Sequence, residues 1–288
     1  MNTADMDALA EIVRLRSGLA LSADKAYLVE SRLTPLARRH GFERLADLLE
    51  VLRRGAPEAL LADVTEAMTT NESFFFRDKT PFDLFAERML PSLIAARGAG
   101  QSVRIWCAAS STGQEPYSLA MTLREKGARL GALRAEIIAT DISRAVLERA
   151  KAGVYTKFEV QRGLPIQLLV KYFEQAGDDW RLKPEIRQMV QFRAFNLLTP
   201  FTPLGRFDII FCRNVLIYFD RPTKADVLER MRQALAPDGY LVLGAAETVL
   251  GITEAFEPVP EARGLYRPVA GERKAASSAP PRAAASAR

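Results

Sequence analysis

The segment from Val103 to Leu119 constrains the fold of this chain more than any other. An apolar strand pattern leads into a loop of small residues, Ala108–Gly113, and a helical pattern follows with Pro116 in its first turn. A strand, a small-residue loop and a helix in this order open a doubly wound, Rossmann-like sheet. Small side chains in the loop let the backbone approach a ligand closely. The segment therefore predicts an α/β sheet with a ligand site at its edge.

Glu115 narrows the class of ligand, because it lies at the N-terminus of the predicted helix. A pyrophosphate would bind at this place in a dinucleotide-binding sheet, and a carboxylate there repels phosphate. A ligand with an amino group or a positive centre suits it, and S-adenosylmethionine has both. The loop also carries Ala108 and Ser110 where a dinucleotide fingerprint has its first two glycines. This difference argues against a nicotinamide or flavin cofactor.

The rest of the chain predicts helices followed by a mainly parallel sheet. Residues 1–85 are predicted to form an all-helical domain and 86–270 the sheet domain. An insertion at 155–190 is too long for a simple crossover and contains a hairpin turn at Gly177–Asp179. Residues 271–288, rich in Ala, Ser and Pro, are predicted to be a disordered tail. Strands are expected near 103–108, 136–140, 189–195, 207–212 and 239–244, a closing hairpin at 255–260 and 264–269, and helices near 82–97, 115–127, 143–151 and 222–236.

Composition excludes several classes of protein. The chain has 288 residues, 48% of them hydrophobic, and no apolar run reaches the ~20 residues of a membrane span. Its first residues show no charged-then-apolar leader, so no secretory signal is expected. Cys107 and Cys212 lie in predicted buried strands and indicate reduced thiols, while a single histidine, His40, argues against a metal site. A cytoplasmic protein without a metal or direct membrane insertion is predicted.

The net charge of +5 does not by itself indicate a nucleic-acid partner. Residues 271–288 carry four basic side chains against Glu272, a net +3, which leaves +2 for the other 270 residues. The body of the chain shows no basic stripe that would follow a phosphate backbone. We therefore expect no nucleic acid among its partners.

Asp141 ends the second predicted strand, in the segment IIATDIS. A carboxylate at this place accepts hydrogen bonds from both ribose hydroxyls of an adenosine ligand. Alternatively, Asp141 or Ser143 caps the next helix. The upstream loop Ala108–Gly113 favours the ligand role for Asp141.

Further polar residues are predicted at the carboxyl ends of strands, where such sheets bind ligands. Asn196–Leu197 ends the third strand and Arg213–Asn214 the fourth; an amide there can read the edge of adenine, although Asn is also common in turns. Tyr218 follows as either a core residue or one whose hydroxyl enters the site.

The segment TNESFFFR lies between the helical region and the sheet. Taken alone, Asn71 and Ser73 are typical of helix caps and Phe74–Phe76 of a core. Arg77 is the exception, because a guanidinium held against an apolar wall is suited to binding a carboxylate.

The segments TTNESFFFRD, IWCAASSTGQEPYSLA, ATDIS, NLL and FCRNVLIYFD, in this order, closely resemble the chemotaxis receptor methyltransferases, the CheR family. The resemblance covers about residues 5–268. It implies a Rossmann-like S-adenosylmethionine-dependent methyltransferase sheet with an N-terminal all-helical domain and a small antiparallel β insertion. It also implies methyl esterification of glutamates on the cytoplasmic helices of chemoreceptors, for sensory adaptation, with S-adenosylhomocysteine as the product.

The resemblance assigns roles to individual residues. Arg77 and Tyr218 match the residues beside the reacting methyl group. The basic segment Lys25–His40, which alone is typical of a solvated helix face, is implied to dock on the acidic receptor through Arg32, Arg38 and Arg39. The loop Gln175–Trp180 is compact and acidic beside members that bind a receptor tether peptide, which argues against a tether here. The cofactor positions correspond to Asn71, Ser73, Arg77, Glu115, Asp141, Asn196, Leu197, Arg213 and Asn214.

The proposed reaction needs no general base. A glutamate has a pKa of ~4.3 and is ionised at neutral pH, and alignment alone can supply ~7–11 kcal/mol of a barrier. Two other functions stay open at this point. One is a nucleic-acid methyltransferase, although the segment around Asn214 lacks a Pro-Pro-aromatic sequence. The other is a module that senses S-adenosylmethionine without catalysis.

Overall fold

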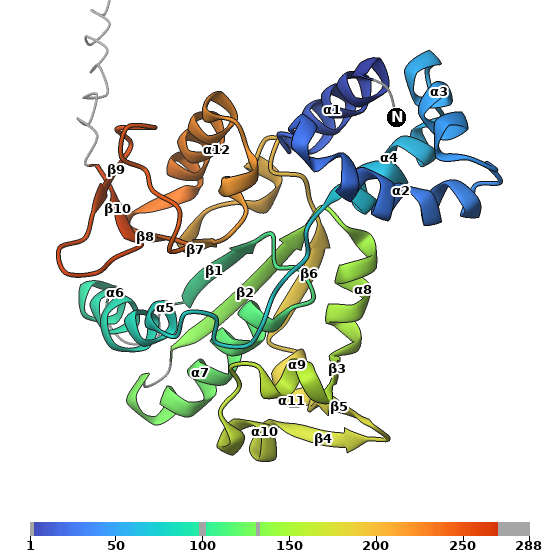
Figure 1. The fold of residues 1–288 in the computed structure, drawn as a ribbon. Coiled ribbons are helices and arrows are strands. Elements are labelled where there is room, and N and C mark those ends of the chain that lie inside the picture. Colours follow the sequence, from blue (N-terminus) through green and yellow to red (C-terminus); the bar gives the residue numbers. More distant parts are fainter. Residues whose placement is uncertain (1–2, 98–101, 131–132, 270–288) are drawn as a thin grey trace, which may run out of the picture.

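The computed structural model describes residues 3–97, 102–130 and 133–269, so the predicted tail at 271–288 lies outside the described residues. The N-terminal part is helical, as the spacing of its apolar residues predicted, and its helices enclose a core around Leu33, Leu48 and Val64. Figure 1 shows these helices gathered at one end of the sheet. Their bounds are α1 Thr3–Ser17, η1 Ala23–Lys25, α2 Ala26–Arg39, α3 Leu45–Arg54 and α4 Glu58–Met68.

The sheet has seven strands in the order β6-β2-β1-β7-β8-β10-β9. The first five are parallel, and β10 pairs antiparallel with both β8 and β9, which confirms the mainly parallel sheet and the closing hairpin. No helix in the described ranges is long and apolar enough to cross a bilayer. The strands are β1 Ser102–Ala108, β2 Arg134–Asp141, β6 Val190–Ala194, β7 Phe207–Cys212, β8 Leu235–Leu243, β9 Phe256–Pro258 and β10 Leu265–Pro268.

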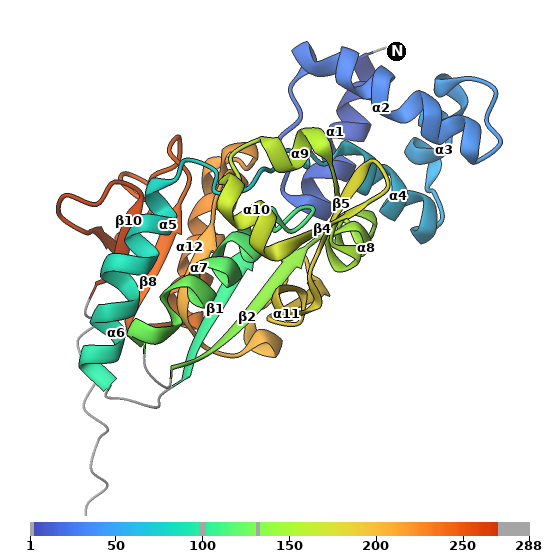
Figure 2. The ribbon, with the colours of Figure 1, turned by 90° about the horizontal axis from the view of Figure 1, so that it is seen from below.

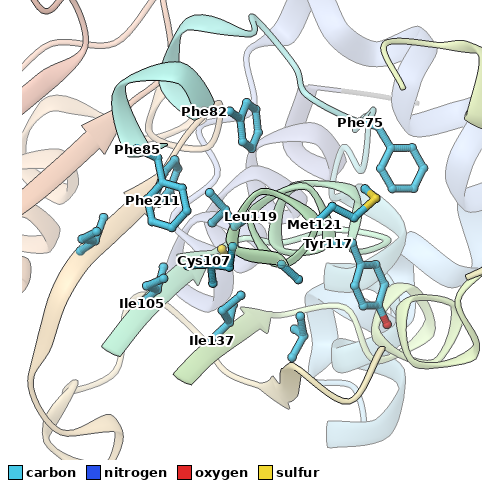
Figure 3. Packing of buried hydrophobic residues seen from close by; sticks show 14 of the residues in the cluster. Phe75, Phe82, Phe85, Ile105, Cys107, Tyr117, Leu119, Met121, Ile137 and Phe211 are labelled. Atoms are coloured by element: carbon cyan, nitrogen blue, oxygen red, sulfur yellow. The ribbon is translucent and has the colours of Figure 1, made fainter. Parts of the chain in front are cut away.

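Both faces of the sheet are covered, so successive side chains of each central strand enter two different cores. On β1, Cys107 packs in the core that includes Phe211, Tyr117 and Leu119, as Figure 3 shows, whereas Trp106 packs in the core on the opposite face. This explains the nearly continuous apolar sequence of the strands. The covering helices and turns are α5 Thr80–Leu84, η2 Phe85–Met89, α6 Leu90–Arg97, α7 Gln114–Leu130, α8 Arg144–Ala152, η3 Thr202–Leu204, η4 Leu216–Tyr218 and α12 Arg221–Ala234.

The predicted insertion is a small subdomain with its own three-stranded antiparallel sheet, in the order β3-β5-β4. The hairpin between β4 and β5 turns at Gly177–Asp178, as the sequence indicated. Figure 2 shows the subdomain beside α7 and α8. Its elements are β3 Val154–Thr156, α9 Lys157–Gln161, α10 Ile166–Tyr172, β4 Phe173–Ala176, β5 Asp179–Leu182 and α11 Pro184–Arg187.

The segment between α4 and α5, residues 69–79, differs from the prediction of helices up to residue 85. It is a linker without helix, because Phe76, Asp78 and Lys79 have φ of 51°, 66° and 43°, outside the helical range. Neither Asn71 nor Ser73 caps a helix, since Lys79 is the residue before α5. Phe75 is fully buried and anchors the linker in the core.

A buried hydrogen bond of the Trp106 indole allows a test of what stabilises the sheet. Trp106 Nε1 donates to Thr140 Oγ1 at 2.9 Å, and both residues are buried. Replacing Thr140→Val keeps the shape but leaves the indole N–H unpaired, so we expect the free energy of unfolding to fall by about 1–3 kcal/mol in urea titrations. Thr122→Val, which removes a hydroxyl bonded within α7, is the control and should change stability less. An equal loss in the two variants would contradict the argument.

Candidate functional site

A cavity lies at the carboxyl edge of the parallel strands, and residues of the helical part of the chain cover it. Its wall combines residues of α1 and the 69–77 linker with the loops that follow β1, β2, β6 and β7. Such an edge is where open α/β sheets bind ligands. Every residue predicted to bind the cofactor or to lie beside the reacting methyl group lines it: Asn71, Ser73, Arg77, Glu115, Asp141, Asn196, Leu197, Arg213, Asn214 and Tyr218.

A buried guanidinium forms the floor of this cavity. Arg213, at the end of β7, has a side chain only 2% exposed, and its Nη1 donates to Glu115 Oε2 at 2.8 Å. Its Nη2 donates to Asp78 Oδ2 at 2.7 Å and to the Arg77 carbonyl at 2.9 Å. Arg213 therefore joins the sheet, the N-terminus of α7 and the linker.

Asp141 is held by backbone N–H groups at the end of β2. Its Oδ2 accepts from Ser111 N at 2.8 Å and its Oδ1 from Ser143 N at 2.9 Å. The helix cap is Ser143, whose Oγ accepts from Val146 N. Asp141 thus does not cap α8, and its carboxylate borders the cavity. The alternative left open by the sequence is resolved in favour of Ser143 as the cap.

The loop after β1 bends sharply where it lines the cavity. Ala109 and Ser111 have φ of 57° and 49°, in the left-handed region that residues other than glycine rarely adopt. Strained backbone of this kind concentrates at binding sites. The side chain of Ser111 also reaches across the cavity rim, where its Oγ donates to the Asn71 carbonyl at 2.7 Å.

The linker holds Arg77 at the wall of the cavity. The guanidinium of Arg77 lies 5.4 Å from the centre of the Phe74 ring, and its Nη1 donates to the Glu72 carbonyl at 3.1 Å. Arg162 of the insertion pairs with the Glu72 carboxylate at 2.6 Å and also lies over Phe74. The linker is therefore fixed from the insertion as well as from the sheet.

The amide of Asn196 is already used within the protein. Its Nδ2 donates to the Arg16 carbonyl at 2.6 Å, and its Oδ1 accepts from Leu198 N at 3.0 Å. These bonds join the loop after β6 to the end of α1. An amide has two N–H donors and an oxygen with two acceptor sites, and Asn196 borders the cavity, so the reading of adenine by this residue stays a prediction.

The three arginines predicted to dock on a receptor have different surroundings. Arg38 and Arg39 are exposed near the end of α2. Arg32 is half-buried and points to the linker: its Nη1 donates to the carbonyls of Met68 and Thr69 at 2.7 and 3.0 Å. No local pattern distinguishes Arg32 from the other two arginines, because its partners lie 36 and 37 positions away in the chain.

Two acidic residues that sequence reasoning missed hold the site together. Glu66, on α4, accepts at Oε1 from Ser143 Oγ at 2.8 Å and from Ala145 N at 3.0 Å, and so binds the N-terminus of α8. Glu247, after β8, accepts from Asn214 N at 2.8 Å. Neither lies in a recognisable motif. Asp78 was within the quoted segment TTNESFFFRD but was not singled out.

Burial dominates the electrostatics of the two cavity carboxylates. Burial raises the pKa of Glu115, although the Arg213 guanidinium acts in the opposite direction. Burial also raises the pKa of Asp141, against the backbone N–H groups that favour its charged form. A ligand that offers a cation or hydroxyl donors therefore stabilises the ionised form of both carboxylates.

The cavity also contains polar atoms suited to a ligand with many hydrogen-bonding groups. Ser110 lines it, and its Oγ is buried with no hydrogen-bond partner among the residues that the structure describes. The Glu115 carboxylate suits an ammonium group, and the Asp141 carboxylate suits a pair of ribose hydroxyls. These residues fit S-adenosylmethionine, which carries an ammonium group, a ribose and an adenine.

Comparison with known proteins agrees with this fit. Residues 4–69 match the family model "CheR methyltransferase, all-alpha domain", and residues 71–265 match "CheR methyltransferase, SAM binding domain". The chain is 43% identical over 271 residues to "Chemotaxis protein methyltransferase 1" of Pseudomonas aeruginosa, covering 92% of this chain and 97% of that one. It is 44% identical over 245 residues to "Chemotaxis protein methyltransferase" of Vibrio anguillarum, covering 84% and 88%.

The raised pKa values lead to a pH dependence of cofactor binding. We expect ionised Glu115 to attract the ligand ammonium and its protonation to remove that attraction. We therefore expect the Kd for S-adenosylhomocysteine to rise as pH falls from 8 towards 5, beginning above the ordinary glutamate pKa of 4.5. Glu115→Gln should weaken binding at pH 8 by about tenfold or more and flatten the profile. Calorimetric titration measures both effects.

The control is Glu174→Gln, on the exposed surface of β4, which should retain the pH profile of the unmodified protein. If Glu115→Gln kept the same affinity and the same pH dependence, Glu115 would not contact the ligand ammonium.

Proposed function

This chain belongs to the CheR methyltransferase family, with S-adenosylmethionine as its cofactor, and on that premise we propose that it methylates glutamate side chains of chemoreceptors. The product is a glutamate methyl ester on the cytoplasmic helices of the receptor, so we also place the reaction in the cytoplasm. The observation that carries the proposal is the cavity that combines the buried carboxylate of Asp141 with the half-buried carboxylate of Glu115 and the half-buried cation Arg77.

The chemistry of the cavity wall supports a carboxylate as the methyl acceptor. None of the described residues that line it is a histidine, cysteine or lysine. An amine acceptor must lose a proton before it attacks, which calls for a base. A glutamate is already ionised at neutral pH and needs only to be oriented. Arg77 supplies the cation that can orient it.

The roles of the residues follow from their charges and places. Glu115 binds the ammonium of the cofactor and Asp141 its ribose. Asn71, Ser73, Asn196, Leu197, Arg213 and Asn214 form the remaining wall of the cofactor site. Arg77 binds the cofactor carboxylate or orients the substrate carboxylate, and Tyr218 shapes the channel between the two reactants.

The bound cofactor supplies an electrophilic methyl group on a sulfonium centre. The chain then has to align a carboxylate oxygen with that methyl group and keep water away. Opposite charges cancel as the ester forms, so a cavity that excludes water lowers the barrier relative to the reaction in water. Arg77 must guide the carboxylate without binding it so tightly that it stops reacting.

We propose that the helical domain, residues 1–85, docks on the receptor through exposed basic residues of α2. Arg38 and Arg39 face solvent on that helix and complement an acidic receptor surface. The sheet domain, 86–270, performs the transfer. We retain the proposal that the compact loop Gln175–Trp180 does not bind a receptor tether.

The type of bond formed decides the proposed function. Incubation of the chain with methyl-labelled S-adenosylmethionine and receptor cytoplasmic fragments should label the fragments, and dilute alkali should release the label as methanol. Arg77→Ala should lower the rate by about tenfold or more, because an Arg–carboxylate contact is lost. Arg181→Ala, exposed on β5, should not. Label that survives alkali would indicate an amide or amine product and contradict ester formation.

Binding of the cofactor and of the receptor should respond to different arginines of α2. Arg38→Glu with Arg39→Glu should raise the KM for the receptor fragment by about tenfold at low salt, with the Kd for S-adenosylhomocysteine unchanged. Arg32→Ala removes the bonds to the Met68 and Thr69 carbonyls and should raise that Kd. Steady-state kinetics and calorimetry separate the two effects; an unchanged KM in the double variant would contradict docking through α2.

A further inference from the structure

Glu247 is the centre of a cluster of backbone donors next to the cavity. The residue is half-buried in the connection that follows β8. Its Oε2 accepts from Gly244 N at 2.7 Å and Asn214 N at 2.8 Å. Its Oε1 accepts from Val215 N at 2.9 Å and Ile217 N at 3.3 Å. One carboxylate thus satisfies four N–H groups, three of them from the loop after β7.

The loop has the shape of an anion-binding site. Asn214 has a φ of 59°, the left-handed conformation that asparagine tolerates better than most residues. An alternation of left- and right-handed residues makes successive N–H groups converge on one point. Here the anion at that point is the side chain of Glu247. Gly244 allows the approach, because a Cβ at this position would lie 2.7 Å from Glu247 Oε2.

The same loop carries a residue of the reaction site. It begins at Arg213, which is fixed by its ion pairs, and continues into η4, whose last residue is Tyr218 at the cavity wall. From the opposite side, Ala20 N donates to the Tyr218 carbonyl at 2.8 Å. Between Arg213 and Tyr218, the side-chain acceptor that holds the backbone is Glu247.

We propose that Glu247 is a positioning residue that sets the place of Tyr218 in the methyl-transfer site. It does not line the cavity. It acts through the backbone of residues 214–217, so its removal displaces the Tyr218 side chain while Glu115 and Asp141 keep their places. The part of this inference that concerns the rate rests on the proposed function.

The charge of Glu247 is essential to this role. Each of its oxygens accepts two N–H groups, so a neutral amide of the same shape turns an NH₂ group towards two donors. Glu247→Gln therefore releases the loop with almost no change in volume. Glu254→Gln is the matched control, because Glu254 lies in the same connection and is exposed.

The first measurement is hydrogen exchange of the full chain, followed in the peptide that contains residues 214–217. We expect at least about tenfold faster exchange in Glu247→Gln than in Glu254→Gln, with the melting temperature recorded to compare global stability. Gly244→Ala, which crowds the carboxylate without altering its charge, should act in the same direction. Exchange at the unmodified rate in Glu247→Gln would overturn the proposal. This measurement uses no methyl acceptor, so it stands even if the proposed substrate is wrong.

The second measurement is a double-mutant cycle on kcat at saturating cofactor. If Glu247 acts through Tyr218, the loss of kcat caused by Glu247→Gln should shrink by about tenfold in a Tyr218→Phe background. The same loss in both backgrounds, or an unchanged kcat in the single variant, would overturn the positioning role. If the unmodified protein did not methylate the receptor fragments, the proposed function would be refuted instead. The exchange measurement would then decide whether Glu247 holds the loop.

Discussion

The buried Arg213 guanidinium is the interaction on which the site depends. It lies between Glu115 at the start of α7 and Asp78 in the linker, with both ion pairs at 2.7–2.8 Å. A charge that is 2% exposed is tolerable only with such partners, and removing one partner of a buried pair typically costs about 3–5 kcal/mol. The arrangement also favours the ionised form of Glu115 in a place where burial opposes it. The Arg213 side chain thus has two effects. It holds Glu115 and Asp78 in place, and it favours the charged form of Glu115, which suits an ammonium group.

The linker at 69–79 connects the Arg213 ion pairs to the other parts of the chain that surround the site. The helical part contacts it through Arg32, the insertion through Arg162, and the sheet through Arg213. Phe75 anchors its middle in the sheet core. A segment with so many long-range partners has one preferred path, although it contains little regular structure. It therefore brings Arg77 to the cavity without a helix or strand to carry it.

The sequence predicted the features that depend on local patterns, and it missed the contacts between side chains that lie far apart in the chain. The strands, the insertion and the closing hairpin were visible as periodicity and turns. The loops after β2, β6 and β7 were identified by their polar residues, whereas the connection after β8, which carries Glu247, was missed. The prediction of a helical domain up to residue 85 did not show where the helices are interrupted, since the three phenylalanines and two cap-like residues of the linker give no sign of the positive φ at Phe76 and Asp78. The partner of Asn196 was invisible because Arg16 lies 180 positions away.

The acidic residues around the cavity differ in how many backbone N–H groups each accepts. Glu247 accepts four, so its charge is compensated by the loop that it holds and little of it is available to a ligand. Among the described residues, Glu115 has one guanidinium partner and no backbone donor. A cation of the ligand would therefore directly stabilise its negative charge. Asp141 is intermediate, with Ser111 and Ser143 fixing its oxygens and the cavity still beside them. The count of donors, which no sequence pattern reveals, separates the acids that shape the site from those that bind in it.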